Sequence, residues 1–183
     1  ENLEKLASQI GLLLRYKLKV ATRPLRVQLV SATGLPKATK ITNSRLQIMM
    51  RTFIAPCYTG PRDRVYITLP LYHATGGACG IGQALMTGAS VILRRKFSAT
   101  AFWDDVVDEG ATSIVYIGEL CRYLLNQPVH PKERQHRLRT GFGNGLRAEI
   151  WTEFRERFNI TNLVEFYGAT DGNVNLMSID GTV

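Results

Sequence analysis

The sequence LRTGFGNGLRAEIWTEFRERFN at residues 138–159 contains a complete strand–turn–helix pattern. A short β-like run leads into a turn that has three glycines around Asn144. The pattern then becomes helical, because Ile150, Phe154 and Phe158 recur on one face. A strand that passes through glycine into an amphipathic helix is the repeating unit of parallel sheets.

The same alternation continues on both sides of this stretch. Short β-like runs occupy 26–31, 63–72, 90–95, 112–118 and 163–170. Helical patterns lie at 2–18, 76–88, 119–127, after Thr42 and after Ser98. We expect Ser98 to cap its helix. The alternation predicts an α/β fold with a parallel-rich sheet and helices on both faces.

The composition bounds the class of protein. A chain of 183 residues with 45% hydrophobic and 21% charged residues fits one globular domain. Its net charge of +8 favours anionic partners such as nucleotides, CoA or acidic lipid, and a solvated basic surface explains the charge equally well. Because the basic residues are dispersed and not interleaved with aromatic residues along one element, we expect no nucleic-acid partner.

The cysteines and the hydropathy pattern exclude other classes. Cys57, Cys79 and Cys121 are far apart and form no CxxC pair, so we expect free thiols rather than disulfides or a zinc site. No apolar run approaches the roughly 18 residues of a membrane span. We expect a cytoplasmic protein without a transmembrane segment, and peripheral contact with a membrane stays open.

Three loops rich in Gly, Ser, Thr and Asn follow predicted strands, at 31–37, 143–147 and 168–173. Ligands of parallel sheets bind at the C-terminal ends of the strands. The loops are far apart in sequence, and we expect them to converge on one edge of the sheet. This convergence is the first indication of function.

The first loop has the residue types of a phosphate-binding loop. Ser31 and Thr33 offer hydroxyl groups, Gly34 admits a close approach, and Lys37 supplies a positive charge for phosphate. The loop does not match the Walker A pattern, and an ordinary surface turn is the alternative interpretation.

The second loop suits a flat ring. Gly143 and Gly145 flank Asn144, so a ring can lie against the backbone while the amide of Asn144 donates and accepts hydrogen bonds at a base edge. A tight turn between a strand and a helix explains the same residues.

The third loop combines an aromatic ring with oxygen ligands. Tyr167 can stack on a base, Gly168 admits a close approach, Thr170 offers a hydroxyl, and Asp171 is an oxygen ligand suited to Mg²⁺. An Asx-type turn is the alternative. His73 follows another strand and could line a carboxylate pocket, although a single histidine more often has a structural role.

Taken in order, these segments resemble the adenylate-forming synthetases, and more narrowly the fatty-acid transport protein and very-long-chain acyl-CoA synthetase family. The resemblance covers about residues 31–180 and leaves 1–28 unplaced. The segments that carry it are TGLPKATKITNSR, LPLYHATGG, GIGQALMTGASVILRRKFSATAFWDD, YIGELCRYLLNQP, GNGLR and EFYGATDGN. The fourth segment, and the RRKFSA and FWDD parts of the third, are peculiar to this family.

The resemblance implies a fatty acid–CoA ligase that uses ATP, Mg²⁺ and CoA. A carboxylate attacks the α-phosphate of ATP, and CoA thiolate then displaces AMP from the acyl-adenylate. The family pattern assigns phosphate binding to Ser31, Thr33, Gly34, Lys37 and Thr170. It assigns the adenine to Gly143, Asn144, Gly145 and Tyr167, the metal to Asp171, and the acyl carboxylate to His73, and we expect Gly168 to belong to the same nucleotide site. Lys37, Thr170 and Asp171 are the expected catalytic residues.

The chain departs from the family pattern in two loops. The family's phosphate loop reads Thr-Ser-Gly-Thr-Thr-Gly-Leu-Pro-Lys, whereas this chain reads VSATGLPK, one residue shorter, with Ala32 where glycine is expected. Asp171 replaces the usual Glu, which sets the carboxylate about 1.5 Å further back.

The family's later ribose-binding Asp, its hinge and its small C-terminal domain with a catalytic Lys have no counterpart among the 183 residues. We therefore expect 29–183 to be a partial adenylation domain, a fragment that is inactive alone. Two alternatives stay open beside the ligase: a truncated, non-catalytic remnant that binds nucleotide or acyl chain, and a lipid-uptake module at a membrane face.

Overall fold

The computed structural model describes residues 25–29, 37–170, 172 and 175–179, with backbone alone for 25–29, 37 and 38. The chain divides into two compact units, 1–46 and 47–183. The helix predicted at 2–18 lies outside the described residues.

The first unit contains a β-hairpin. Strands β1 (Leu25–Leu29) and β2 (Lys37–Ile41) pair antiparallel, with Leu29 opposite Lys37. Helix α2 (Asn43–Arg51) then begins, and Thr42 caps it, because its Oγ1 accepts a hydrogen bond from the backbone N–H of Arg45 at 3.2 Å. The strand near 26–31 and the helix after Thr42 are confirmed. The sequence pattern predicts no strand between the first loop and that helix, whereas Lys37–Ile41 forms one.

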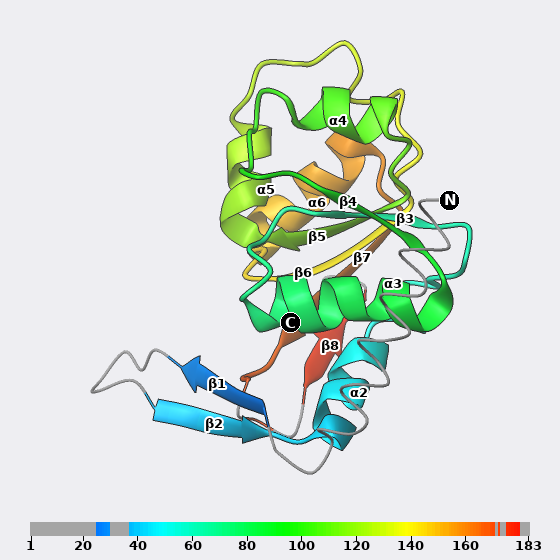
Figure 1. The fold of residues 1–183 in the computed structure, drawn as a ribbon. Helices are drawn as coiled ribbons and strands as arrows, with labels where there is room; N and C mark the ends of the chain where they lie inside the picture. The colour runs from blue at the N-terminus through cyan, green and yellow to red at the C-terminus, as the bar shows by residue number, and fades with distance from the viewer. Residues whose placement is uncertain (1–24, 30–36, 171, 173–174, 180–183) are drawn as a thin grey trace. The chain divides into compact units, whose positions relative to one another are not determined.

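The second unit is built on a six-stranded sheet in the order β4-β3-β5-β6-β7-β8 (Figure 1). All neighbouring strands are parallel except β7 and β8, which pair antiparallel. The strands are β3 (Arg64–Ile67), β4 (Ser90–Leu93), β5 (Ser113–Ile117), β6 (Thr140–Asn144), β7 (Asn162–Tyr167) and β8 (Leu176–Ser178). The parallel-rich sheet is therefore confirmed.

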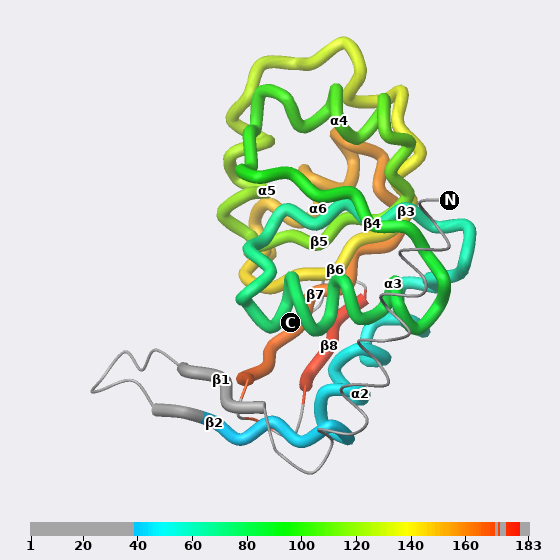
Figure 2. Tube along the Cα trace, in the orientation of Figure 1, coloured from blue at the N-terminus to red at the C-terminus, as the bar shows by residue number. Residues whose placement is uncertain are grey.

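Helices cover both faces of this sheet, as predicted (Figures 1 and 2). A π-helix, η1 (Thr75–Ile81), continues into α3 (Gly82–Thr87) on one face. The other face carries α4 (Phe102–Asp108), α5 (Gly118–Leu125) and α6 (Ala148–Phe158).

Among the element boundaries that differ from the sequence prediction, two have a clear local cause. The strand predicted at 63–72 ends at Ile67, because the chain then folds into a turn before η1. Helix α4 begins at Phe102 rather than directly after Ser98. The Ser98 hydroxyl accepts a hydrogen bond from the backbone N–H of Ala101 at 3.3 Å, so it stabilises the turn before the helix instead of capping it.

The core has two layers because successive strand residues face opposite sides of the sheet. On the α4–α6 side, Tyr66 and Tyr116 are buried in a cluster of large side chains: Ile92, Phe102, Trp103, Val106, Ile114, Leu124, Trp151, Phe154, Phe158 and Leu163. On the η1–α3 side, Val65, Ile67 and Val115 belong to a second cluster, which includes Phe53, Cys57, Cys79, Phe142 and Val164. Burial of both faces explains why the strands read as nearly continuous apolar runs.

A charged cluster joins the N-terminal ends of three parallel strands. Asp63 precedes β3, Thr112 precedes β5 and Arg139 precedes β6. The Asp63 carboxylate accepts hydrogen bonds from Arg139 Nη2 at 2.6 Å, from Thr112 Oγ1 at 2.7 Å and from Gly60 N at 2.8 Å. Because Asp63 is buried and fully partnered, this cluster fixes the edge of the sheet opposite the predicted site.

Candidate nucleotide site

The C-terminal ends of parallel strands bring two of the three predicted loops together. Asn144 ends β6 and Tyr167 ends β7, and these strands are neighbours in the sheet. His73 follows β3 on the same edge, two strands from β6. The prediction of convergence on one edge is thus confirmed for the loop at 143–147 and for residues 168–170 of the loop after β7.

The first predicted loop, 31–37, does not follow a strand of this sheet. Lys37 is the first residue of β2 in the hairpin of the other unit, so the expectation that all three loops end parallel strands is wrong. Ser31, Thr33, Gly34 and Asp171 lie outside the described residues.

Gly145 shapes the turn after β6. Its φ is +80°, a left-handed conformation that favours glycine, and Gly118 at the start of α5 packs against it. A Cβ on Gly118 would overlap the carbonyl oxygen of Gly145. The turn is therefore seated tightly against the beginning of α5.

Because Gly143 has no side chain, the Tyr116 ring can lie over strand β6. Tyr116 on β5 is paired with Gly143 on β6, and a Cβ on Gly143 would lie 2.6 Å from Cε2 of the Tyr116 ring. Gly143 in turn pairs with Glu165 on β7. Since no side chain stands between them, Tyr116 reaches across β6, and its hydroxyl donates a hydrogen bond to Glu165 Oε2 at 3.0 Å.

Glu165 is a site residue that the sequence reasoning missed. Its second oxygen, Oε1, accepts a hydrogen bond from the backbone N–H of Leu146 at 3.1 Å, directly after the glycine turn. Burial raises the pKa of the Glu165 carboxyl above its ordinary value, although hydrogen bonds from Tyr116 and from the backbone of Leu146 and Gly145 oppose the rise. The signal was a carboxylate inside the apolar strand LVEFY.

The end of β7 presents an aromatic surface. Tyr167 is 79% exposed at the last position of the strand, so its ring is available for stacking. Gly168 follows, and a Cβ there would meet Oδ1 of Asn175. Thr170 lies in the connection between β7 and β8, half-buried.

His73 lies in the turn between β3 and η1. Its Nδ1 accepts a hydrogen bond from the backbone N–H of Thr75 at 3.2 Å, and its carbonyl oxygen accepts one from Gly77 N at 2.8 Å. With Nδ1 as an acceptor, Nε2 is the ring nitrogen that can donate a hydrogen bond. The exposed ring can therefore donate a hydrogen bond to an anion.

Two helices begin at this edge, α5 after β5 and α6 after β6. Their N-cap residues, Ile117 and Arg147, make no side-chain capping hydrogen bond. The first backbone N–H groups of a helix lack intrahelical partners and carry partial positive charge, so both helix ends favour an anionic ligand.

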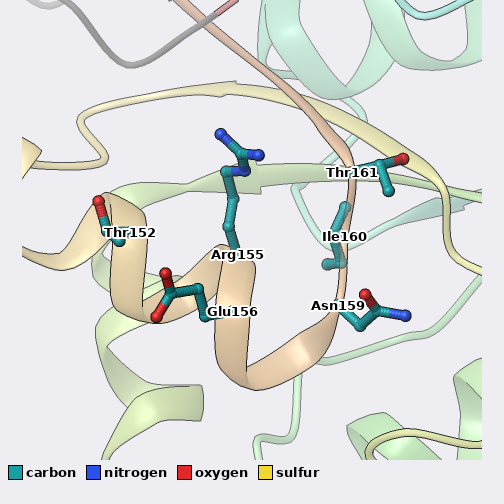
Figure 3. A pocket seen from close by; sticks show the side chains of 6 residues that line it. All are labelled: Thr152, Arg155, Glu156, Asn159, Ile160 and Thr161. Carbon is teal, nitrogen blue, oxygen red and sulfur yellow. The ribbon is translucent and has the colours of Figure 1, made fainter.

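Other features of the described residues lie apart from this edge. A pocket of about 250 Å³ lies where α6 leads into β7, at the N-terminal end of that strand (Figure 3). Its lining residues are Thr152, Arg155, Glu156, Asn159, Ile160 and Thr161. Across the described ranges, no three His, Cys, Asp or Glu side chains gather as metal ligands. In the same ranges, no helix has the length and apolarity required to cross a bilayer.

The sequence profile of the AMP-binding enzyme family matches residues 31–182. Human long-chain fatty acid transport protein 1 is 48% identical over 151 residues, which are 82% of this chain and 23% of that protein. The medium/long-chain-fatty-acid–CoA ligase FadD6 of Mycobacterium tuberculosis is 42% identical over 157 residues, 82% of this chain and 26% of that protein. The chain thus spans about a quarter of the length of these curated relatives.

Solved structures share the fold. The inhibitor-bound N-terminal domain of FACL13 from Mycobacterium tuberculosis superposes with a TM-score of 0.70 at 20% identity, covering 84% of this chain and 39% of that one. ATP-bound MatB from Rhodopseudomonas palustris gives a TM-score of 0.69 at 21% identity, covering 82% of this chain and 30% of that one.

Proposed function

Because this chain belongs to the family of AMP-binding enzymes, we propose that it supplies part of the nucleotide site of an ATP-dependent fatty acid–CoA ligase. The observation that carries the proposal is the meeting of the glycine turn after β6 with the Tyr167–Thr170 segment after β7 on adjacent parallel strands. The likeness to a fatty acid–CoA ligase and to a fatty acid transport protein supports the choice of substrate.

The nucleotide is held by its base and by its phosphates. Asn144 offers hydrogen bonds to the base edge, and the exposed ring of Tyr167 stacks on the base. The N-terminal ends of α5 and α6 favour the phosphates by their dipoles. Thr170 adds a hydroxyl group, and the family pattern assigns the positive charge for phosphate to Lys37.

The reaction has two steps. In the first, a carboxylate oxygen of the fatty acid attacks the α-phosphorus of ATP, the bond to the β-phosphate breaks, and pyrophosphate leaves. In the second, CoA thiolate attacks the acyl carbonyl carbon and AMP leaves. The protein contributes mainly by positioning the reactants and stabilising charge.

His73 has a specific part in the first step. The Nε2–H of its ring donates a hydrogen bond to the fatty acid carboxylate and orients it toward the α-phosphate. A Mg²⁺ ion held by Asp171 and the phosphate oxygens would neutralise phosphate charge, in keeping with the preference of Mg²⁺ for few carboxylates plus phosphates.

Calorimetric titration of the 183-residue chain with MgATP tests the proposal. We expect binding that is weakened at least tenfold, about 1.4 kcal/mol, by Thr170→Ala and by Lys37→Ala. Lys40→Ala is the matched control, since Lys40 is an exposed lysine in the same strand. Absence of MgATP binding by the parent chain refutes the proposal.

Pyrophosphate exchange into ATP, measured with palmitate, separates catalysis from binding. Exchange that requires Lys37 and Thr170 supports the ligase. Binding without exchange favours the second candidate, a nucleotide-binding segment without catalytic activity of its own.

A further inference from the structure

The Glu165 carboxylate connects three parallel strands at the candidate site. Tyr116 on β5 donates to Oε2 at 3.0 Å, and Leu146 N, just after β6, donates to Oε1 at 3.1 Å. Glu165 itself belongs to β7 and pairs with Gly143 on one side and Ser178 on the other. One side chain therefore holds the ends of β5, β6 and β7 in a fixed relation.

One of the two groups that Glu165 holds is a backbone N–H at the border of the site. Leu146 directly follows Gly145, and both residues lie in the connection between Asn144, the last residue of β6, and α6. Tyr167, the exposed aromatic, is only two residues along β7 from Glu165. The carboxylate therefore sets the separation between the glycine turn and the stacking ring.

We propose that Glu165 is a positioning residue that fixes the gap between the Asn144–Leu146 turn and Tyr167 in which the nucleotide base lies. The proposal rests on the proposed function, because the ligand is the nucleotide of that site. Glu165 does not touch the ligand itself. It acts through the backbone of the turn and through the strand that ends at Tyr167.

A purely packing role does not explain a carboxylate at this position. Burial disfavours the ionised group, and an apolar residue would fill the same space without that penalty. What an apolar residue cannot do is accept hydrogen bonds from Tyr116 and Leu146 N at once. Burial also raises the pKa of the Tyr116 hydroxyl, so the hydroxyl stays protonated and remains a donor.

The test measures affinity for the base rather than stability alone. The parent chain and Glu165→Ala are titrated with MgATP and MgGTP. We expect Glu165→Ala to bind MgATP at least tenfold more weakly and to lose most of the preference for ATP over GTP. Glu165→Gln keeps an acceptor for Leu146 N–H and is expected to bind MgATP within about threefold of the parent.

A matched pair of tyrosine variants provides the control. Tyr66 and Tyr116 each donate to a carboxylate at 3.0 Å, but Tyr66 bonds Asp105 in α4, away from the glycine turn. We expect Tyr116→Phe to lower the ATP preference and Tyr66→Phe to leave it unchanged. Equal effects of the two variants, or unchanged base preference in Glu165→Ala and Tyr116→Phe, would overturn the proposal.

Amide hydrogen exchange distinguishes this proposal from the proposed function. Exchange at Leu146 N–H should accelerate in Glu165→Ala and return toward the parent rate in Glu165→Gln. A parent chain that binds no nucleotide defeats the proposed function, and the exchange rates then still show whether Glu165 holds the turn. Unaltered exchange at Leu146 in Glu165→Ala defeats the positioning role directly.

Discussion

Replacing Gly143 with alanine tests the close packing of β5 against β6. A Cβ at this position would lie 2.3 Å from the carbonyl oxygen of Tyr116 and 2.6 Å from Cε2 of its ring. Ordinary contacts to a Cβ begin at 3.4 Å, so the overlap is about 1 Å. The ring could rotate away, but the carbonyl oxygen is fixed in the paired strand β5.

The expected cost follows from that rigid neighbour. Overpacking a core costs typically 1–3 kcal/mol, and occasionally more. Because a backbone atom must move, we expect Gly143→Ala to lower the free energy of unfolding by about 3 kcal/mol. For a chain of this size, that loss lowers the melting temperature by roughly 6–12 °C.

Urea unfolding followed by tryptophan fluorescence measures this loss, since Trp103 and Trp151 are both buried in the α4–α6 layer. Gly60→Ala is the control, because nothing lies within 4 Å of a Cβ at Gly60 and its φ is not positive. We expect that control to stay within about 0.5 kcal/mol of the parent. A Gly143→Ala protein as stable as Gly60→Ala would refute the packing described for β5 and β6.

Three further predictions concern the opposite edge of the sheet and the thiols. Arg139→Leu removes hydrogen bonds to the Asp63 carboxylate and to two carbonyl groups. It should lower the free energy of unfolding in urea by about 2 kcal/mol. An equal loss in the exposed control Arg137→Leu would contradict this prediction. Burial opposes ionisation of Asp63, but hydrogen bonds from Thr112, Gly60 and Arg139 lower its pKa below the ordinary 3.8. The ionised Asp63 carboxylate therefore stabilises the folded protein fully above pH 3.8, and this stabilisation is lost as the pH falls through the lower folded pKa. Asp63→Asn should reduce the pH dependence of the free energy of unfolding below pH 3.8. An unchanged acid-unfolding profile would argue against it. Burial raises the pKa of Cys57 and Cys79 to about 12. Iodoacetamide at about pH 8 should therefore label these two thiols only after unfolding. Rapid labelling of the native protein would count against their burial.

Hydrophobic periodicity predicted most elements of the second unit. In 138–159, the run before the glycines is β6, and the face with Phe154 and Phe158 is the buried face of α6. Such patterns are predictable because the apolar periodicity of each strand or helix is contained within its own stretch of sequence. The edge at which the loops after β6 and β7 meet was predictable for the same reason, since parallel strands place their C-terminal ends together.

The features that the sequence did not reveal depend on pairing between distant segments. The bond from Tyr116 to Glu165 joins residues 49 apart, and it exists only because Gly143 separates them in the strand register. Strand β8 has three residues and no alternation long enough to detect. A helix is predicted at 76–88 and is present, but nothing in TGGACGI indicates that its first part, η1, is a π-helix.

The charged cluster around Asp63 has a consequence for variation in this domain. It joins chain segments at the end of the strands opposite Asn144 and Tyr167. Substitutions at that end should reduce the amount of folded protein that accumulates. Replacement of the loop after β7 should alter which ligand is bound and leave the amount of folded protein nearly constant. A deep mutational scan that scores abundance and ligand capture separately would then divide its strongest hits between the two ends of the same strands.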